Sequence, residues 1–251
     1  MKRRIPLTTQ IFYGVGVSYA IVDQIFAQWI LYFYLPPENS GLKPFLTPVL
    51  ISLALAISRV VDMISDPVVG YLSDKFNSRW GRRIPFIAVG AIPLAITTVA
   101  FFYPPMISEK GTFIYLALIG SLFFTFYTIV GAPYNALIPE IGENSEERLD
   151  LSTWQSVFRL LYSAIAMILP GVLIKYFGKG DTLVGIRGMV ISLSILCVLG
   201  LYVTVFLVPE KKYSRPVEHV GNIKEILKEV ISDAKRSLNI LIGGLYNGKR
   251  N

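Results

Sequence analysis

Two aspartates, Asp62 and Asp66, lie four residues apart within a long apolar stretch of the chain. This spacing puts both carboxylates on one face of a helix, which they share with Arg59, three residues before Asp62. Because two ionised carboxylates are costly together in a low-dielectric environment, the pair needs a cation, a proton or an arginine beside it. Ser65 adds a hydroxyl oxygen at the same level. Oxygen ligands suit hard cations, so these residues predict a Na⁺, Li⁺ or H⁺ site, with Asp62 and Asp66 as ligands of any metal ion.

Two other interpretations of the aspartate pair are open. In the first, Arg59 neutralises one aspartate, the other stays protonated, and the three side chains only hold helices together. In the second, the carboxylates catalyse hydrolysis within the membrane, although the sequence supplies neither a nucleophile nor a water path. A charge at the centre of a bilayer costs at least about 2.5 kcal/mol. Because a purely structural role would leave this cost without a function, a cation or proton site is the favoured interpretation. No enzyme is expected.

A second group of polar residues is predicted to contact a polar solute. Asp23 lies at the centre of the first apolar stretch, and Tyr19 lies one helical turn before it. The alternative role for Asp23 is a polar contact between helices. Asn135 belongs to a polar patch in the fourth apolar stretch, and Arg159 lies about one turn inside the fifth. Arg159 has an equally favoured alternative, which is to extend its guanidinium to the membrane surface.

The composition places these residues in a membrane. Of the 251 residues, 53% are hydrophobic and 16% are charged, and the mean hydropathy is +0.54, whereas soluble domains are about a quarter charged. The net charge of +7 does not indicate a nucleic-acid partner, because the basic residues lie between apolar runs. One cysteine, Cys197, and one histidine, His219, cannot make a disulfide within the chain or a histidine cluster for zinc or haem. No cofactor is expected besides the cation.

The sequence predicts six membrane-spanning helices. About 20 mainly apolar residues cross the ~30 Å hydrocarbon core of a bilayer. Six such stretches occur, at residues 11–35, 45–72, 84–103, 113–138, 154–177 and 185–208. The expected fold is therefore an all-α integral membrane protein with lipid around it, in which residues 1–210 form one bundle. At 1.5 Å per residue, Asp62 lies about 18 Å from Asp74 at the end of its helix, close to the middle of the membrane.

Lysine and arginine in the short loops predict the orientation. They gather before the first stretch, between the second and third, and after the sixth, as Lys2, Arg3, Arg4, Lys75, Arg79, Arg82, Arg83, Lys211, Lys212 and Arg215. We therefore expect a multi-pass protein of the cell membrane (inner or plasma membrane) with both termini in the cytoplasm. Residues 211–251 are polar, with apolar residues at helical spacing from Ile223 to Leu238, and they predict an amphipathic cytoplasmic tail helix.

Two runs of residues resemble a known family. Gly70 to Lys75 (GYLSDK), followed by Arg79 to Arg83 (RWGRR), is similar to the loop between the second and third helices of the major facilitator superfamily. The longer run from Arg59 to Gly70 (RVVDMISDPVVG) resembles the glycoside–pentoside–hexuronide cation symporters, the melibiose permease-like members of that superfamily. The resemblance covers residues 8–210. It implies the N-terminal six-helix half of a twelve-helix fold.

The resemblance also implies roles for individual residues. The cation site of the family falls on Asp62, Ser65, Asp66 and Thr128. The sugar site departs from the family pattern, since Gly131 and Asn135 stand where melibiose permease has an aspartate and a tryptophan, and Ser156 stands where it has an arginine. We therefore expect the coupling cation to be retained, and galactoside recognition to differ.

A further cluster is expected to gate the protein. Asp74 can pair with Arg82 or Arg83, near acidic residues such as Glu140, and close the cytoplasmic mouth in one conformation. We call Asp74, Arg82, Arg83 and Glu140 the arginine cluster, and we assign Arg59 a gating role as well.

The sequence thus predicts one half of a secondary transporter that couples Na⁺ or H⁺ to the symport of a sugar, a glycoside or a related solute. Its expected partner is a C-terminal six-helix half or a second copy of the chain. Two alternatives stay open. The chain is a non-transporting six-helix scaffold or dimer subunit in the first, and a symporter of a non-sugar amphipathic solute such as a lysolipid in the second.

Overall fold

The computed structural model of the chain describes residues 5–37, 43–76, 78–105 and 108–213. Within these residues the regular elements are all helices, joined by loops, and one isolated β-bridge pairs Ser78 with Gly81. The elements in chain order are α1 (Leu7–Val15), the 3₁₀-helix η1 (Gly16–Tyr19), α2 (Ala20–Tyr34), α3 (Pro48–Lys75), α4 (Ile84–Ala100), α5 (Glu109–Ile141), α6 (Ser145–Gly178), α7 (Thr182–Leu207) and α8 (Glu210–Tyr213). The predicted tail helix falls in residues 214–251 and lies outside the described residues.

The described helices have the length and composition of membrane spans. Five are long and apolar enough to cross a membrane, with α1, η1 and α2 counted together as one helix from Leu7 to Tyr34. The remaining apolar helix, α4, has 17 residues. Turn-like hydrogen bonds carry its chain on to Tyr103, whose N–H donates to the carbonyl of Ala100 at 3.0 Å. The protein is therefore an all-α membrane protein, as the composition predicts.

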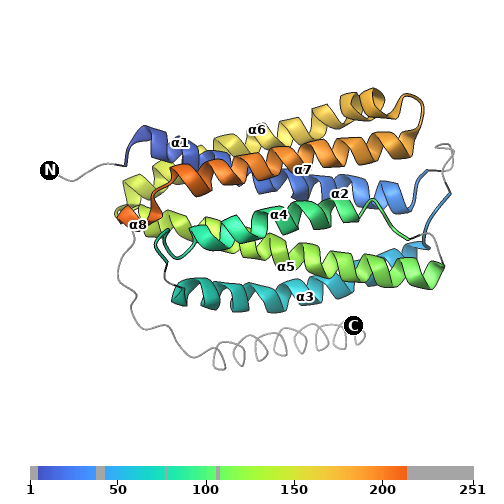
Figure 1. Cartoon of the computed structure of the whole chain (residues 1–251), viewed down its shortest axis with the longest axis horizontal. Coiled ribbons are helices and arrows are strands. Elements are labelled where there is room, and N and C mark those ends of the chain that lie inside the picture. The colour runs from blue at the N-terminus through green and yellow to red at the C-terminus, as the bar shows by residue number, and fades with distance from the viewer. Residues whose placement is uncertain (1–4, 38–42, 77, 106–107, 214–251) are drawn as a thin grey trace, which may run out of the picture.

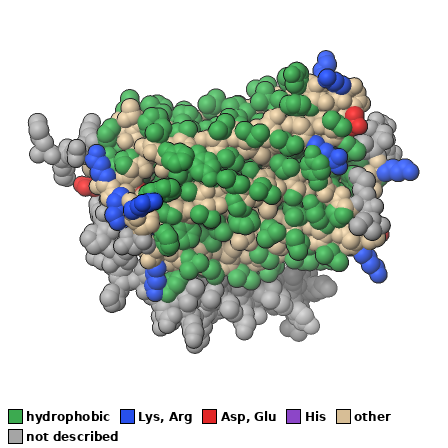
Figure 2. All heavy atoms as spheres, in the orientation of Figure 1, with side chains coloured by type: hydrophobic (Ala, Val, Ile, Leu, Met, Phe, Trp, Pro, Cys, Tyr) green, Lys and Arg blue, Asp and Glu red, His purple; other side chains and the backbone are tan. Residues whose placement is uncertain are grey.

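The helices pack as a bundle in which α3 and α6 lie at opposite edges (Figure 1). α3 packs on α5, α5 on α4, α4 on α7 and α7 on α6, while α1, η1 and α2 lie among α5, α6 and α7. On the face seen in Figure 2, hydrophobic side chains cover the middle of the bundle, and the charged side chains gather near its two ends. α3 and α6 expose large apolar side chains such as Val60, Met63, Leu160 and Met167. In a bilayer, these two helices present apolar surface to lipid or to another helical unit.

The first span is interrupted by the 3₁₀-helix, and neighbouring helices satisfy the backbone there. The hydroxyl of Thr204 donates to the carbonyl of Phe12 at 2.6 Å, and the hydroxyl of Tyr162 donates to that of Val15 at 3.0 Å. Irregular backbone is tolerated at membrane depth only where such partners exist. Gly16 is needed at this break, because a Cβ there would overlap the side chain of Thr204. The hydroxyls supplied by α6 and α7 therefore allow the irregular backbone of η1 inside the bundle.

The helix bounds follow capping groups where these differ from hydropathy. α5 begins at Glu109 rather than 113, because the Ser108 hydroxyl accepts the N–H of Gly111 at 3.0 Å. α6 begins at Ser145 rather than 154, because the Asn144 side chain accepts the N–H of Glu147 at 2.9 Å. The extra turns are polar, so the apolar stretches mark the membrane-embedded part of each helix and the caps mark its true start.

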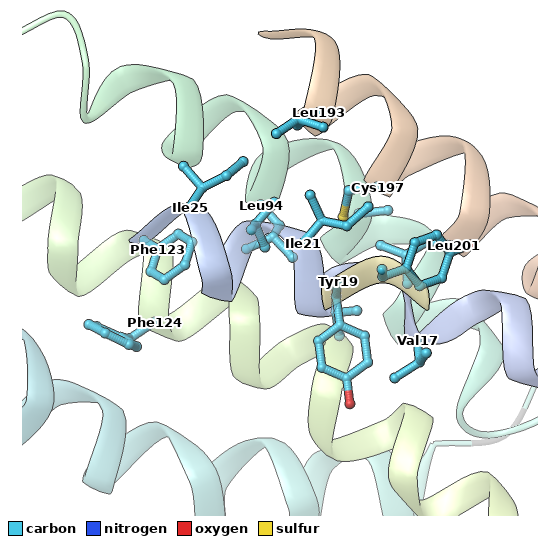
Figure 3. Close-up of a cluster of buried hydrophobic side chains, with 14 of the residues drawn as sticks. Val17, Tyr19, Ile21, Ile25, Leu94, Phe123, Phe124, Leu193, Cys197 and Leu201 are labelled. Atoms are coloured by element: carbon cyan, nitrogen blue, oxygen red, sulfur yellow. The ribbon is translucent and has the colours of Figure 1, made fainter. Parts of the chain in front are cut away.

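The core lies along the first span. Figure 3 shows Ile21 and Ile25 from α2 among Leu94 of α4 and Leu193 and Cys197 of α7. Ser18 ties η1 to this cluster through its hydroxyl, which donates to the carbonyl of Cys197 at 2.7 Å. The Tyr19 hydroxyl points away from these side chains (Figure 3). Tyr19 is thus buried against the core, with the polar end of its side chain directed away from the apolar cluster.

Candidate functional site

The two aspartates of α3 meet a threonine of α5. The hydroxyl oxygen of Thr128 lies 2.7 Å from Oδ1 of Asp66 and 3.1 Å from Oδ1 of Asp62. A hydroxyl has one proton, so it can donate to only one of these carboxylates at a time. Thr128 is buried. The structure thus gathers three oxygens around one point, with one proton to share among them.

Arg59 compensates part of the negative charge at this point. Its guanidinium lies 3.4 Å from Oδ2 of Asp62 and stacks over the ring of Phe124, 4.0 Å from the ring centre. Asp66 makes no ion pair with any residue that the structure describes. One guanidinium and two ionised carboxylates leave a net charge of −1. A single monovalent cation or proton between Asp62 and Asp66 would neutralise it.

The described residues hold no group of three or more histidine, cysteine, aspartate or glutamate side chains that could bind a metal ion. Divalent cations such as Ca²⁺ usually take several carboxylate or carbonyl oxygens. Two carboxylates and one hydroxyl are a sparser set with less charge. The residues present therefore suit Na⁺, Li⁺ or a proton better than a divalent metal.

The aspartates open into a cavity of about 310 Å³ between η1, α3, α5 and α6. Its lining is Tyr19, Asp62, Asp66, Tyr127, Thr128, Gly131, Ala132, Asn135 and Arg159. At about 1.5 Å per residue, Asp62 lies roughly 20 Å from either end of α3, so the cavity lies near the middle of the helix. Six residues that the sequence nominated separately, three for a cation and three for a solute, thus line one space.

On the solute side of the cavity, side chains from α6, η1 and α5 form a chain of hydrogen bonds. A guanidinium nitrogen of Arg159 lies 3.4 Å from the Tyr19 hydroxyl, and that hydroxyl lies 3.5 Å from Oδ1 of Asn135. Gln155 donates to the same Asn135 oxygen at 2.9 Å. Since the oxygen of Asn135 accepts these contacts, its amide N–H groups are left as donors. The two longer contacts are weak, so a bound solute can replace them at little cost.

Gly131 contributes space rather than contacts. A Cβ at this position would lie 3.6 Å from a ring carbon of Tyr19, at ordinary contact distance. The glycine therefore leaves room beside Tyr19 that larger side chains would fill. This is one of the three positions at which the sequence departs from the sugar-site pattern of the family.

Three of the nominated residues do not line the cavity. Asp23 is half-buried in α2 and does not line the cavity. Ser65 donates to the backbone carbonyl of Asp62 at 2.9 Å, and it does not line the cavity either. Arg59 contacts Asp62 and Phe124, about four helical turns along α3 from Asp74. Its surroundings associate it with the cation site rather than with the arginine cluster.

The arginine cluster lies where α3 ends and α4 begins. Arg83 forms an ion pair with Asp74 of α3, and Arg82 forms an ion pair with Glu140 of α5. Both arginine side chains are largely buried. The carboxylate of Glu210, in α8, accepts the backbone N–H groups of this same segment. Asp74 thus pairs with one of the two arginines, as expected, and Glu140, which was expected only nearby, pairs with the other.

Three residues of these sites did not stand out in the sequence. Tyr127 and Gln155 reach the solute side of the cavity and its hydrogen-bonded chain, and Glu210 reaches the arginine cluster. Tyr127 precedes Thr128 directly, and Gln155 lies one turn before Arg159 on α6, so their spacing to nominated residues is the signal that was available. For Glu210, which follows Pro209 at the end of the sixth span, no signal in the sequence pointed to its partners.

The comparisons with known proteins indicate the family of the chain. The family described as "MFS/sugar transport protein" matches residues 12–246. The putative glycoside/cation symporter YagG of Escherichia coli is 30% identical over 92% of this chain, and the inner membrane symporter YicJ of the same organism is 28% identical over 88%. The isoprimeverose transporter of Lactiplantibacillus pentosus is 26% identical over 72%.

The chain spans about half the length, or less, of these relatives. It covers 49% of YagG, 46% of YicJ and 37% of the isoprimeverose transporter. The relatives are named as symporters or transporters, and the family model covers nearly the whole chain. The chain therefore belongs to the MFS/sugar transport family, among the glycoside–pentoside–hexuronide cation symporters of the major facilitator superfamily.

Proposed function

We propose that this chain is the N-terminal half of a symporter that couples Na⁺ or H⁺ to the movement of a sugar, a glycoside or a related polar solute. The observation that carries the proposal is the shared cavity. Asp62, Asp66 and Thr128 line one side of it, and Tyr19, Asn135 and Arg159 line the other. A cation and a solute that bind in one space of about 310 Å³ must affect each other's affinity, and that effect is reciprocal.

The charge at the cavity explains how the cation would promote solute binding. On the cation side of the empty cavity, Arg59 balances one of two carboxylates, and the negative charge left there repels the acceptor oxygens of a solute, while Arg159, which lines the same cavity, attracts them. A bound Na⁺ or proton removes that excess. Arg159, Tyr19 and the amide of Asn135 can then donate to the hydroxyl or ring oxygens of the solute. A coupling of 1–3 kcal/mol, about 5–150-fold in affinity, is typical of linked sites.

Transport further requires that the cavity open to each side in turn. Family folds do this by rocking two six-helix units around a site at the midplane. The partner unit would be a C-terminal six-helix half or a second copy of this chain, packed on the exposed apolar surface of α3 and α6. The arginine cluster, at one end of the bundle, would gate the mouth at that end as the units rock.

We place the protein in the cell membrane, with the α3–α4 loop and both termini in the cytoplasm, on the basis of the lysines and arginines in the short loops. With Cys197→Ser as the background, a cysteine replacing the exposed Trp80 should resist an impermeant thiol reagent in intact cells. A cysteine replacing the exposed Lys110, at the opposite end of the bundle, should react. After permeabilisation both should react. Labelling of Trp80→Cys in intact cells would reverse the proposed orientation.

Uptake by reconstituted protein tests the proposed function. Proteoliposomes that contain this chain with a matching C-terminal half receive an imposed Na⁺ or H⁺ gradient, and a panel of sugars, glycosides and lysolipids is offered. We expect one gradient to drive accumulation of one solute class above its external concentration. Accumulation of lysolipids alone would select the amphipathic-solute alternative. Absence of accumulation with every solute and both gradients would contradict transport and favour the scaffold.

A further inference from the structure

Glu210 is a fully buried carboxylate at the end of the sixth span. It follows Pro209 directly and begins the short helix α8. Its Oε1 accepts the backbone N–H of Arg82 at 2.6 Å, and its Oε2 accepts that of Ile84 at 2.8 Å. The N–H of Arg83 lies 3.0 Å from both oxygens. A buried charge requires such compensation, and here three consecutive backbone N–H groups provide it.

These contacts satisfy the start of α4. The first N–H groups of a helix have no partner within the helix, and α4 has no capping side chain of its own at Arg83. A carboxylate at this end is also favoured by the helix dipole. Gly81 makes room for it, because a Cβ at Gly81 would overlap the Glu210 carboxylate. The φ of Gly81, +123°, likewise excludes most other residues.

The same segment carries the two arginines of the cluster. Their backbone is fixed by Glu210, and their side chains leave it in different directions. Arg82 reaches Glu140 of α5, whereas Arg83 reaches Asp74 and the Ser73 hydroxyl of α3. Glu210, in α8 just after the end of α7, thus contacts the backbone of the segment from which two guanidiniums reach α3 and α5.

We propose that Glu210 is a positioning residue for the arginine cluster. It binds the backbone of Arg82 and Arg83 and so holds both guanidiniums against Asp74 and Glu140. The ends of α3, α5 and α7 are thereby joined through one loop. The proposed gating role of the cluster rests on the proposed function. It then depends on Glu210, a residue outside the cluster and 128 positions after Arg82 in the sequence.

Hydrogen exchange of the reconstituted chain tests this inference without any transport measurement. In Glu210→Gln, which keeps the side-chain size and loses the charge, amides 82–84 should exchange at least about tenfold faster, because hydrogen bonds to a charged group are lost. Residues 72–76 and 138–142 should also exchange faster, as Asp74 and Glu140 lose their arginines. Glu210→Asp, which retains the carboxylate, should change exchange less. The matched control is Glu109→Gln, an exposed carboxylate in the first turn of α5, which should leave all three segments unchanged.

The set of segments whose exchange changes distinguishes positioning by Glu210 from a general loosening of the fold. Arg82→Gln and Arg83→Gln should speed exchange at 138–142 and at 72–76, respectively, and leave 82–84 slow, since Glu210 still binds that backbone. Unchanged exchange at 82–84 in Glu210→Gln would overturn the inference. Faster exchange confined to 82–84 would also overturn it, because Glu210 would then be only a helix cap. If uptake fails while exchange behaves as expected, the proposed function fails and this inference stands.

Discussion

Replacing Asp62 or Asp66 with asparagine should abolish gradient-driven accumulation in the assembled transporter. Each carboxylate supplies charge that a cation needs, and both contact the hydroxyl of Thr128. Loss of one charged contact costs about 1.5–3 kcal/mol, or roughly 10–150-fold in cation affinity. Without the cation, solute can still equilibrate down its own gradient. Uptake by proteoliposomes should therefore fall from accumulation to simple equilibration, which a time course of internal solute concentration measures.

Neighbouring substitutions on α3 and α5 provide the controls. Thr128→Ser keeps the hydroxyl and should retain accumulation, whereas Thr128→Val should raise the cation concentration needed for half-maximal uptake by about tenfold, the smaller end of the effect expected for one lost contact. Ser65→Ala should have little effect, because its hydroxyl donates to the backbone of its own helix. Normal accumulation by both aspartate variants would remove Asp62 and Asp66 from the coupling site.

The second large effect concerns the chain by itself. Expressed alone, it should insert into the membrane and concentrate no solute. The cavity is lined by α3 and α6 from the two edges of the bundle, and Asp66, Asn135 and Arg159 are exposed there. An exposed charge facing lipid costs at least about 2.5 kcal/mol unless another unit covers it. The chain alone should therefore associate with itself and be readily cleaved by protease, and it should lack a closed path for transport.

Co-expression with a matching C-terminal half should restore uptake. Protease resistance should return in parallel, because the partner covers the same surface of α3 and α6. A control partner of similar size from an unrelated membrane family should restore neither. Saturable, gradient-driven accumulation by the chain alone would contradict the proposal of a half-transporter and indicate a functional homodimer.

Local spacing explains which parts of the site the sequence could predict. Asp62, Asp66 and Arg59 are within seven residues of each other on one helix, so helical geometry alone groups them. Thr128 came only from the family resemblance, because its contact with Asp66 joins two helices. The apolar stretches likewise located the spans well, but capping groups such as Ser108 and Asn144 set where the helices begin.

Long-range contacts account for the features that the sequence could not predict. The chain of contacts from Arg159 through Tyr19 to Asn135 joins residues more than a hundred positions apart. Asp23 was grouped with Tyr19 on the assumption of a continuous α-helix. Residues 20–34 are α-helical, so Asp23 does lie about one turn after Tyr19, but that spacing does not determine which side chains line the cavity, and Asp23 is not among them. Glu210 binds backbone groups, which no side-chain pattern records.

Infrared difference spectroscopy of the reconstituted protein tests most directly whether one cation binds between Asp62 and Asp66. Spectra recorded on adding Na⁺, Li⁺ or acid report a change in carboxylate environment or protonation, whichever ion is used. We expect a carboxylate signal that disappears in both Asp62→Asn and Asp66→Asn and persists in Asp23→Asn, since Asp23 lies outside the cavity lining. A signal that is unchanged in the first two variants, or lost in Asp23→Asn alone, would contradict a cation site between Asp62 and Asp66.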